Sequence, residues 1–456
     1  MFLKNIHMSF RISDYTGHYP ALIKLGLPIL VSQLGMIVVG FADNIMVGHY
    51  STPSLASASF VNNVFNIAIL ACLGFSYGLT PLVGAMFNQG RLRGIGALMR
   101  NGLMINLIFS VLLTLVMGVL YLNLHRLGQP EELLPIIRPY YLIYLAGVIP
   151  VALFNVFAQW SYAITNSRMP MWIILVANAA NILGNWLLIF GNWGCPELGL
   201  LGAGISTLFA RLLCMVAIIW IFFWHRSYRE YSDGYRQARV TRTEMLHVFR
   251  TSMPISLQMT LETSAFSLCA IMAGWIDAIS LAAFQIIVIT GTLGFCIYYS
   301  LGAAIAVYVA NAEGAGDRPK VRNVAFAGYQ LMLVLMVVSS LVFTFFGNGI
   351  MAVFTDDPAV RLVTATLIFP LVLYQLGDAT QITFANALRG TSHVMPMFWI
   401  ALVCYLFVGI PSTYIMAFTL DMGVYGIVLS FSVSLFLAAA LFLYFFMRAS
   451  RVGVRQ

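Results

Sequence analysis

Charged side chains are scarce in this chain. Only 9% of its 456 residues are Asp, Glu, Lys or Arg, whereas 61% are hydrophobic. Soluble domains carry about 25% charged residues, so this composition excludes an ordinary water-facing surface for most of the chain. Long polar segments that could form a separate soluble domain are also missing. The sequence therefore predicts an integral membrane protein whose main partner is the lipid bilayer.

Three further absences exclude other classes of function. The three lysines, Lys4, Lys24 and Lys320, do not follow a glycine, so the GxxxxGK[ST] loop that holds nucleotide phosphates is absent. The six cysteines show no CxxC spacing, which argues against a zinc site and a disulfide framework. None of the seven histidines falls deep in an apolar run, which disfavours a membrane enzyme built on a nucleophile and a base. We expect neither an enzyme nor a cofactor.

Apolar runs of about 20 residues or more recur along the whole chain and predict twelve transmembrane helices. The expected ranges are 22–47, 55–87, 97–122, 138–163, 169–191, 200–224, 248–275, 280–311, 323–349, 361–387, 395–420 and 424–447. Six of these spans contain a proline well away from their ends, at positions 28, 81, 150, 254, 370 and 411. Each proline removes a backbone hydrogen bond, so we expect bends in these helices.

Basic residues sort to one side of these spans. The formal charge of +8 is spread over short loops, which disfavours a nucleic-acid partner. Loops 2, 6 and 8 and the C-terminal tail hold most of the arginines, and Arg168 and Arg389 are assigned to loops 4 and 10. By the positive-inside rule, both termini and every even loop are expected to be cytoplasmic.

The chain resembles itself at a shift of 226 residues. At this shift, PI at 28–29 pairs with PI at 254–255, IMVG at 45–48 with IMAG at 271–274, and MPM at 169–171 with MPM at 395–397. Each copy holds an even number of spans, so the copies should be parallel repeats related by an axis along the membrane normal. We predict two pseudo-symmetric six-helix bundles around a central cleft: an N-lobe at 1–225, a cytoplasmic linker at 226–247 and a C-lobe at 248–456.

Three acids lie inside predicted spans: Asp43, Glu262 and Asp378. An ionised side chain at mid-bilayer costs at least about 2.5 to 3.5 kcal/mol, so such residues normally face a cavity or a partner and mark an ion or proton path. Pairing with Arg211, itself inside a predicted span, is an alternative explanation for Asp43. Glu262 and Asp378 have no such neighbour in sequence, and we expect them to bind a proton or a cation.

Amides accompany these acids. Asn178, Asn181 and Asn185 recur at helical spacing and therefore lie on one face. In the second half, the predicted spans around the acids add Gln258, Gln285, Gln375 and Gln381. Hydrogen bonding between helices is common in membranes and explains any one amide equally well. As rows beside acids, however, they favour a hydrated site.

Several strings resemble those of the multidrug and toxic compound extrusion (MATE) family, in particular its bacterial NorM-type branch. These are GFADNIMVG at 40–48 around Asp43, GLTPLVGAMFNQGR at 78–91, LETSAF at 261–266 around Glu262, and GDATQITFANALRG at 377–390 around Asp378. The resemblance covers nearly the whole chain.

This resemblance implies a secondary antiporter in the bacterial inner membrane that exports cationic or amphipathic drugs in exchange for Na⁺ or H⁺. Glu262 and Asp378 would form the cation site of the second lobe, and would hold Na⁺ if sodium is the coupling ion. Asp43, Asn181 and Asn185 would form the site of the first lobe, although some relatives carry an acid where this chain has Asn185. We expect a monomer. The alternative is a lipid-linked oligosaccharide or polysaccharide flippase of the same superfamily, whose cleft would be basic.

Overall fold

The computed structural model describes residues 13–128 and 130–451, and every regular element in them is helical. Eleven helices are long and apolar enough to cross a membrane, and a pair of helices bent by 45° completes a twelfth span. The predicted all-helical membrane fold is therefore confirmed. Within the described residues all six cysteines are free.

The first half of the chain contains spans one to six. Its helices are α1 (Ser13–Thr16), α2 (Tyr19–Tyr50), α3 (Thr52–Ser76), α4 (Leu79–Asn88), α5 (Leu92–Leu122), α6 (Leu134–Ala146), α7 (Val148–Ala163), α8 (Arg168–Phe190) and α9 (Leu200–Trp224).

The second half begins with α10 (Arg229–Gln237) and continues with spans seven to twelve. These are α11 (Arg242–Ile276), α12 (Ala278–Gly314), α13 (Arg318–Phe354), α14 (Pro358–Thr366), α15 (Ile368–Gly390), α16 (Met395–Ala401), a π-helical stretch at Leu402–Gly409, α17 (Ile410–Tyr414), a second π-helical stretch at Ile415–Thr419, and α18 (Gly423–Ala449).

Four of the six intramembrane prolines follow an interruption of their helix. Pro81, Pro150 and Pro370 lie three or four residues after the breaks at Tyr77, Gly147 and Leu367, and Pro411 is the second residue of α17, which follows the first π-helical stretch. A proline ring collides with the carbonyl of the preceding turn and cannot donate to it, so the break falls at this distance. By contrast, α2 and α11 continue through Pro28 and Pro254.

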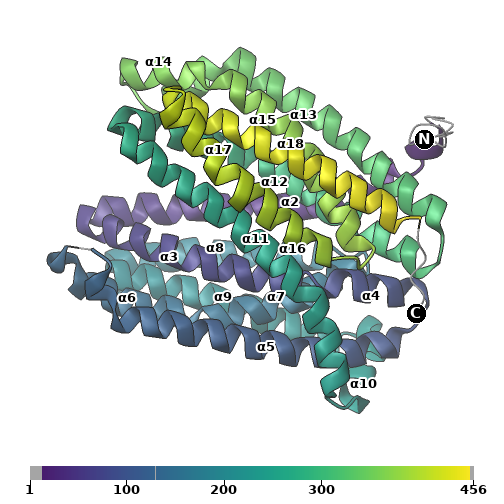
Figure 1. The fold of residues 1–456 in the computed structure, drawn as a ribbon. Coiled ribbons are helices and arrows are strands. Elements are labelled where there is room, and N and C mark those ends of the chain that lie inside the picture. The colour runs from purple at the N-terminus through teal and green to yellow at the C-terminus, as the bar shows by residue number, and fades with distance from the viewer. Residues whose placement is uncertain (1–12, 129, 452–456) are drawn as a thin grey trace, which may run out of the picture.

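The two halves of the chain form two groups of helices. In Figure 1, α3 and α5–α9 occupy the lower part of the molecule, and α13, α15, α17 and α18 occupy the upper part. Contacts between the groups come mainly from the first two spans of each half, since α2 packs on α12 and α11 packs on α3. The first span of each half therefore packs on the second span of the other half, as expected for two parallel repeats.

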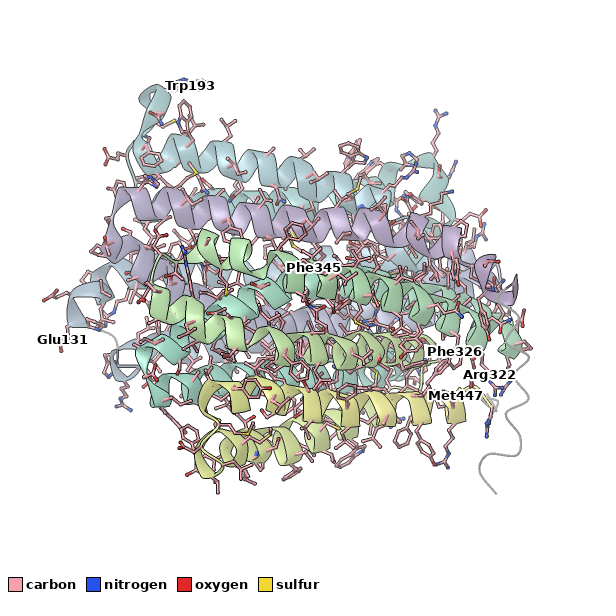
Figure 2. The ribbon with its side chains drawn as sticks, turned by 90° about the horizontal axis from the view of Figure 1, so that it is seen from above. Glu131, Trp193, Arg322, Phe326, Phe345 and Met447 are labelled. Atoms are coloured by element: carbon pink, nitrogen blue, oxygen red, sulfur yellow. The ribbon has the colours of Figure 1, made fainter. Side chains whose placement is uncertain are left out.

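Successive loops lie at opposite ends of the helices. Figure 2 shows Glu131 and Trp193, from loops 3 and 5, at one end of the molecule. Arg322, near the start of α13, and Met447, near the end of α18, lie at the other end. Large apolar side chains such as Leu122, Phe345 and Leu362 are strongly exposed, as they must be on a surface that faces lipid.

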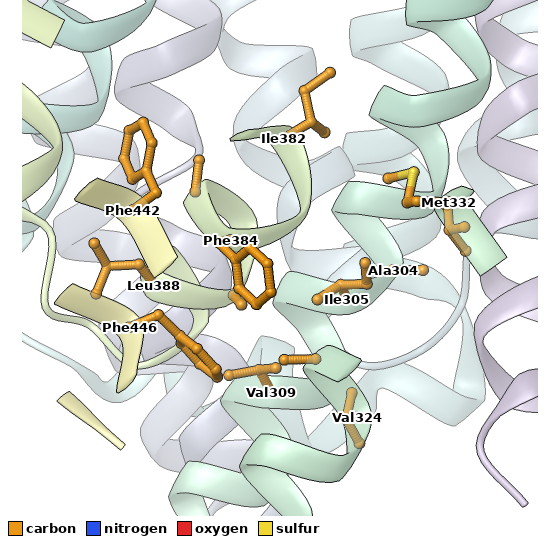
Figure 3. Packing of buried hydrophobic residues seen from close by; sticks show 14 of the residues in the cluster. Ala304, Ile305, Val309, Val324, Met332, Ile382, Phe384, Leu388, Phe442 and Phe446 are labelled. Carbon is orange, nitrogen blue, oxygen red and sulfur yellow. The ribbon is translucent and has the colours of Figure 1, made fainter. Parts of the chain in front are cut away.

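The second half has its own hydrophobic core. Phe384 of α15 packs between α12, α13 and α18, with Ile305, Val324 and Phe446 around it (Figure 3). Phe384 and Phe446 are fully buried. This packing fixes α15, the helix that carries Asp378, against three neighbours.

The segment predicted as a linker is folded onto the first half. Arg100 of α5 donates to the carbonyls of Tyr235, Arg236 and Ala238 at 3.2, 3.2 and 2.6 Å, which satisfies the C-terminal end of α10. Asn101 accepts a hydrogen bond from the backbone of Thr241 at 2.9 Å. The chain is then helical again from Arg242.

One sequence assignment was wrong. Arg389 is not a loop residue: it lies in the last turn of α15 with only 5% of its surface exposed. Its guanidinium lies 5.0 Å from the centre of the Tyr77 ring in the first half, where the aromatic face stabilises the buried cation. The position near the helix C-terminus also favours a positive charge.

The closest approaches of the two halves occur at small residues. A Cβ at Gly84 would lie 2.8 Å from the Ala310 side chain, and one at Gly78 would lie 2.6 Å from the Ser252 backbone. A Cβ at Gly314 would lie 2.8 Å from the carbonyl carbon of Ala85. Gln89 adds a hydrogen bond to the Gly314 carbonyl at 3.1 Å. The two halves are therefore in close contact where α4 meets α12, near the end that carries loops 2 and 8.

We predict that Gly314→Leu weakens this closure. Any side chain there must push α12 away from the Ala85 backbone, and overpacking of this kind costs about 1 to 3 kcal/mol. The thermal midpoint of the purified protein should fall. Gly118→Leu in α5 is the matched control, because a Cβ there meets nothing within 4 Å. Equal midpoints for the two variants would contradict the close packing of α4 and α12.

Candidate functional site: a cavity and a buried carboxyl cluster

A cavity of about 430 Å³ lies between the first half and helices α11 and α12. Most of its wall is apolar or aromatic, with Phe154, Met259 and Phe295 among the lining residues. Asp43 and Arg211 are the only charged side chains in its lining. An apolar cavity with a few convergent polar groups is the usual form of a site for a small organic molecule.

Asp43 is held by two asparagines of α8. Asn185 is fully buried and donates its side-chain amide to the Asp43 carboxylate. With the Asn181 amide oriented to satisfy both of its ends, its nitrogen donates to Asp43 at 2.9 Å and its oxygen accepts from the Thr207 backbone at 3.2 Å. The predicted polar face of α8 is thus directed at the predicted acid.

Asn178, the third member of the row, has a different environment. It lines the cavity, half-buried, and its side-chain nitrogen is buried without a hydrogen-bond partner among the described residues. A Cβ added at Gly35 of α2 would lie 3.1 Å from this nitrogen, so the glycine makes room for the amide.

Arg211 does not form an ion pair with Asp43. The two ion pairs among the described residues join Arg229 to Asp233 and Arg361 to Asp356, so no carboxylate lies within 4 Å of Arg211. Its guanidinium instead lies over the Tyr144 ring, 4.5 Å from the ring centre. The direct Asp43–Arg211 pair that the sequence left open is not formed.

Aromatic hydroxyls line the cavity at its closed end. The hydroxyls of Tyr77 in the first half and Tyr299 in the second half contact each other, and both residues line the cavity together with Tyr162. Behind Tyr77 lies Arg389. This contact between the halves separates the cavity from the closure at Gly84 and Gly314.

A second group of polar side chains lies inside the second half. Gln258, one turn before Glu262 on α11, donates to the Glu262 carboxylate at 2.7 Å, and Gln381 of α15 donates to its other oxygen at 3.4 Å. Tyr405 lies beside the same carboxylate. Gln258 and Gln381 are 6% and 2% exposed, so the acid is bound by buried amides.

Asp378 belongs to the same group. It lies one turn before Gln381 on α15, close enough to Glu262 for the two carboxyls to interact electrostatically. Only 2% of its surface is exposed, and its Oδ2 has no hydrogen-bond partner among the described residues. The structure therefore brings together Glu262, Asp378, Gln258 and Gln381, as the sequence predicted.

This carboxyl cluster contains several unsatisfied polar atoms. Besides Asp378 Oδ2, they include Gln375 Nε2 and Gln381 Oε1. The Gln375 oxygen is satisfied by the hydroxyls of Tyr298 and Ser339 at 3.0 and 2.6 Å. Buried orphan atoms are rare and call for an unseen partner. Two carboxyl groups can accept a proton, and their oxygens and the amide oxygen are ligands that suit a small hard cation such as Na⁺.

The cluster does not line the cavity in this conformation, since Met259, one turn before Glu262, is the nearest lining residue on α11. The threonines of these helices are directed elsewhere. Thr263, Thr290, Thr380 and Thr383 donate to carbonyls of their own helices. Gln285 is exposed, and no hydrogen bond in the described chain joins it to the cluster.

Sequence reasoning missed the aromatic members of both sites. Tyr77, Tyr144, Tyr299 and Tyr405 approach the cavity or the acids from helices far apart in the chain. The 21 tyrosines of the sequence gave no signal that distinguished these four. Arg389 could have indicated Tyr77, because a charge so close to a predicted span needs a partner and the Tyr77 ring provides it.

We predict an energetic coupling between Asn185 and Asp43. Removing the amide by Asn185→Leu leaves a buried carboxyl with one donor fewer, which costs about 1 to 3 kcal/mol. In the Asp43→Leu background the same change should cost much less, and the difference is read from thermal midpoints of the four proteins. Asn178→Leu is the control, since Asn178 makes no bond to Asp43. Additive effects of Asn185 and Asp43 would contradict the hydrogen bond.

Comparison with known proteins places both halves in one family. The family model described as MatE matches residues 28–187 and again 254–415, and these two matches start 226 residues apart. A relative from Geobacillus kaustophilus, named as a probable multidrug resistance protein NorM, is 28% identical, and the alignment covers 95% of each chain.

Solved structures show the same fold. A MATE transporter from Vibrio cholerae, VcmN, superposes with a TM-score of 0.88 at 16% identity, over 96% of this chain and 98% of that one. A transporter of the MOP superfamily from Pyrococcus furiosus, described as having a binding pocket of reverse polarity that suggests a different function, superposes with a TM-score of 0.85 at 18% identity, over 94% and 95%. Members of the family are transporters, not enzymes. With both of its halves matched by the family model, this chain belongs to the MATE family of membrane transporters.

Proposed function

We propose that the protein is a multidrug efflux antiporter that exports organic cations in exchange for Na⁺ or H⁺. The observation that carries this proposal is the pair of the half-buried Glu262 and the buried Asp378, which has no arginine, lysine or histidine within 4 Å among the described residues. When both acids are ionised they repel each other in a medium that screens charge poorly. A proton or a cation relieves this repulsion, and unlike a fixed arginine it can leave.

The cavity provides for the exported molecule. Its apolar wall suits the flat body of an amphipathic drug, and Asp43 supplies a negative charge for an organic cation. The hydrogen bonds from Asn181 and Asn185 hold the carboxylate in place. We infer that Asp43 contacts the drug and that the carboxyl cluster of α11 and α15 takes the coupling ion.

Closure at one end supports alternating access. The close contacts of Gly84 with Ala310 and of Gly78 with Ser252 hold the halves together toward the end that carries the basic even loops, which the positive-inside rule assigns to the cytoplasm. The structure would then represent an outward-facing state, and the cavity would release its drug outward. Loading of Glu262 and Asp378 with an ion would favour separation of these contacts and opening to the inside.

The driving force is sufficient for efflux. Each positive charge that moves inward down a potential of 100 mV supplies about 2.3 kcal/mol, which corresponds to an accumulation of several tens-fold. Coupling requires only that ion and drug favour opposite states of the same rearrangement.

The flippase alternative fits the cavity less well. A lipid-linked pyrophosphate would require several basic residues in the cleft. The cavity contains a single arginine, which Asp43 offsets. The carboxyl cluster also has no assigned use in a flippase of this kind.

We predict that Glu262→Gln abolishes ion-driven efflux. The amide keeps the shape but cannot exchange a proton or attract a cation, so dye efflux from proteoliposomes under an imposed gradient should fall at least about 100-fold. Asp277→Asn is the matched control: Asp277 caps α12 outside the membrane through Ser280, a role that asparagine fills well. Wild-type efflux by the Glu262 variant would remove this mechanism.

We further predict that efflux follows an ion gradient alone. Sodium and proton gradients imposed separately on proteoliposomes should show that at least one of them drives uphill dye movement without ATP. If Na⁺ binds the carboxyl cluster, it should also raise the thermal midpoint relative to choline, because a ligand that binds only the folded state stabilises it. Uphill transport that requires ATP and ignores both gradients would contradict the antiport proposal.

A further inference from the structure

The cavity contains two opposite charges that form no ion pair with each other. Asp43 and Arg211 both line it, yet no carboxylate lies within 4 Å of the Arg211 guanidinium. A cation inside a membrane normally pairs with an acid or leaves the hydrocarbon region. Arg211 does neither, although Asp43 is in the same cavity.

The fold holds the Arg211 guanidinium in place without an acid. Its charge lies over the Tyr144 ring at 4.5 Å, an attractive cation–π arrangement. A Cβ added at Gly147 would lie 2.6 Å from Arg211 Nη1 and 3.1 Å from its Cδ, so only a glycine leaves space for the side chain here. Gly147 also follows the C-terminus of the 13-residue helix α6, an end of a helix that favours a positive charge.

Asp43 also receives its hydrogen bonds from neutral groups. Its hydrogen bonds come from Asn181 and Asn185 of α8, which leave the carboxylate anchored without help from Arg211. Each charge therefore has its own support from neutral groups. Both remain available to a molecule that enters the cavity between them.

We propose that Arg211 is a specificity-determining residue that binds the carboxylate of zwitterionic substrates, while Asp43 binds their cationic group. This inference rests on the proposed efflux function and narrows its substrate class. Guanidinium and carboxylate match as two parallel hydrogen bonds, and such charge-assisted pairs are stronger than neutral ones. The apolar residues that line the same cavity would receive the aromatic body that links the two ends of the substrate.

A purely structural role for Arg211 makes a different prediction. If the arginine only offset the charge of Asp43, its removal would change the affinity for every cation in the same way, whether or not the molecule carried a carboxylate. A matched pair of ligands separates these two roles.

The test uses rhodamine B, which is a zwitterion at neutral pH, and its methyl ester, which is a cation of nearly the same shape. Binding of each dye to the purified full-length protein is measured by fluorescence polarisation, for the wild type, Arg211→Gln and Arg211→Lys. We expect Arg211→Gln to weaken the binding of rhodamine B at least about tenfold, the loss typical of a charged hydrogen bond. The affinity for the ester should change less than about threefold. Arg211→Lys, which keeps the charge, should retain most of the preference for the acid.

Retained binding of the ester also shows that the variants are folded. Equal weakening of both dyes, or no change in either, would overturn the assignment of Arg211 and leave the proposed function intact. If the wild type bound the zwitterion but neither the ester nor any other simple organic cation, the proposed export of cations would fail, and this inference with it.

Discussion

The free energy needed to keep a carboxyl group inside the membrane is the constraint on which the rest of this structure depends. Each of the three acids predicted from the sequence lies in a helix long enough to span a bilayer, and none has a basic partner within 4 Å among the described residues. Side-chain amides take that place at Asp43 and Glu262. Neutral donors stabilise a charge only partly, so these acids remain responsive to a mobile cation.

The two halves solve this problem in different ways. In the first half Asp43 faces a cavity and is fixed by the asparagines of α8. In the second half Glu262 and Asp378 are enclosed with glutamines and tyrosines, and several polar atoms stay unpaired. In the proposed function, the site of the first lobe takes an organic molecule and the site of the second takes an ion. Met259 on α11 connects them, since it lines the cavity one turn away from Glu262.

The packing of helices of one half against helices of the other connects these two sites. Because α11 packs on α3 and α2 packs on α12, neither half can move without altering the contacts of the other. Small residues allow the backbones to approach at the closed end, where Gly314 meets Ala85 and Gly84 meets Ala310. Interfaces of this kind, which lack large interlocking side chains, can separate and re-form as two discrete states.

Much of this could be predicted from the sequence. Apolar length gave the spans, and the 226-residue repeat is confirmed by family matches that start at residues 28 and 254. The acids and amides were found because polarity inside an apolar run is conspicuous. Tyr77 and Tyr405 could not be identified as site residues from the sequence. Tyrosine occurs in lipid-facing and in packed positions alike, and the partners of these two residues come from distant helices. Arg389 was misplaced because hydropathy cannot show that an aromatic ring of the other half covers a charge near a helix end.

The most direct test of the central claim is the number of positive charges that leave the protein when an organic cation binds. Titration of the purified protein with a permanently charged dye in weakly buffered solution, with pH and Na⁺ electrodes, gives this number. If buried carboxyls exchange one cation for another, about one proton or sodium ion should be released for each dye bound. Dye binding with no release of either ion, at any pH and sodium concentration at which the protein is folded, would contradict the account.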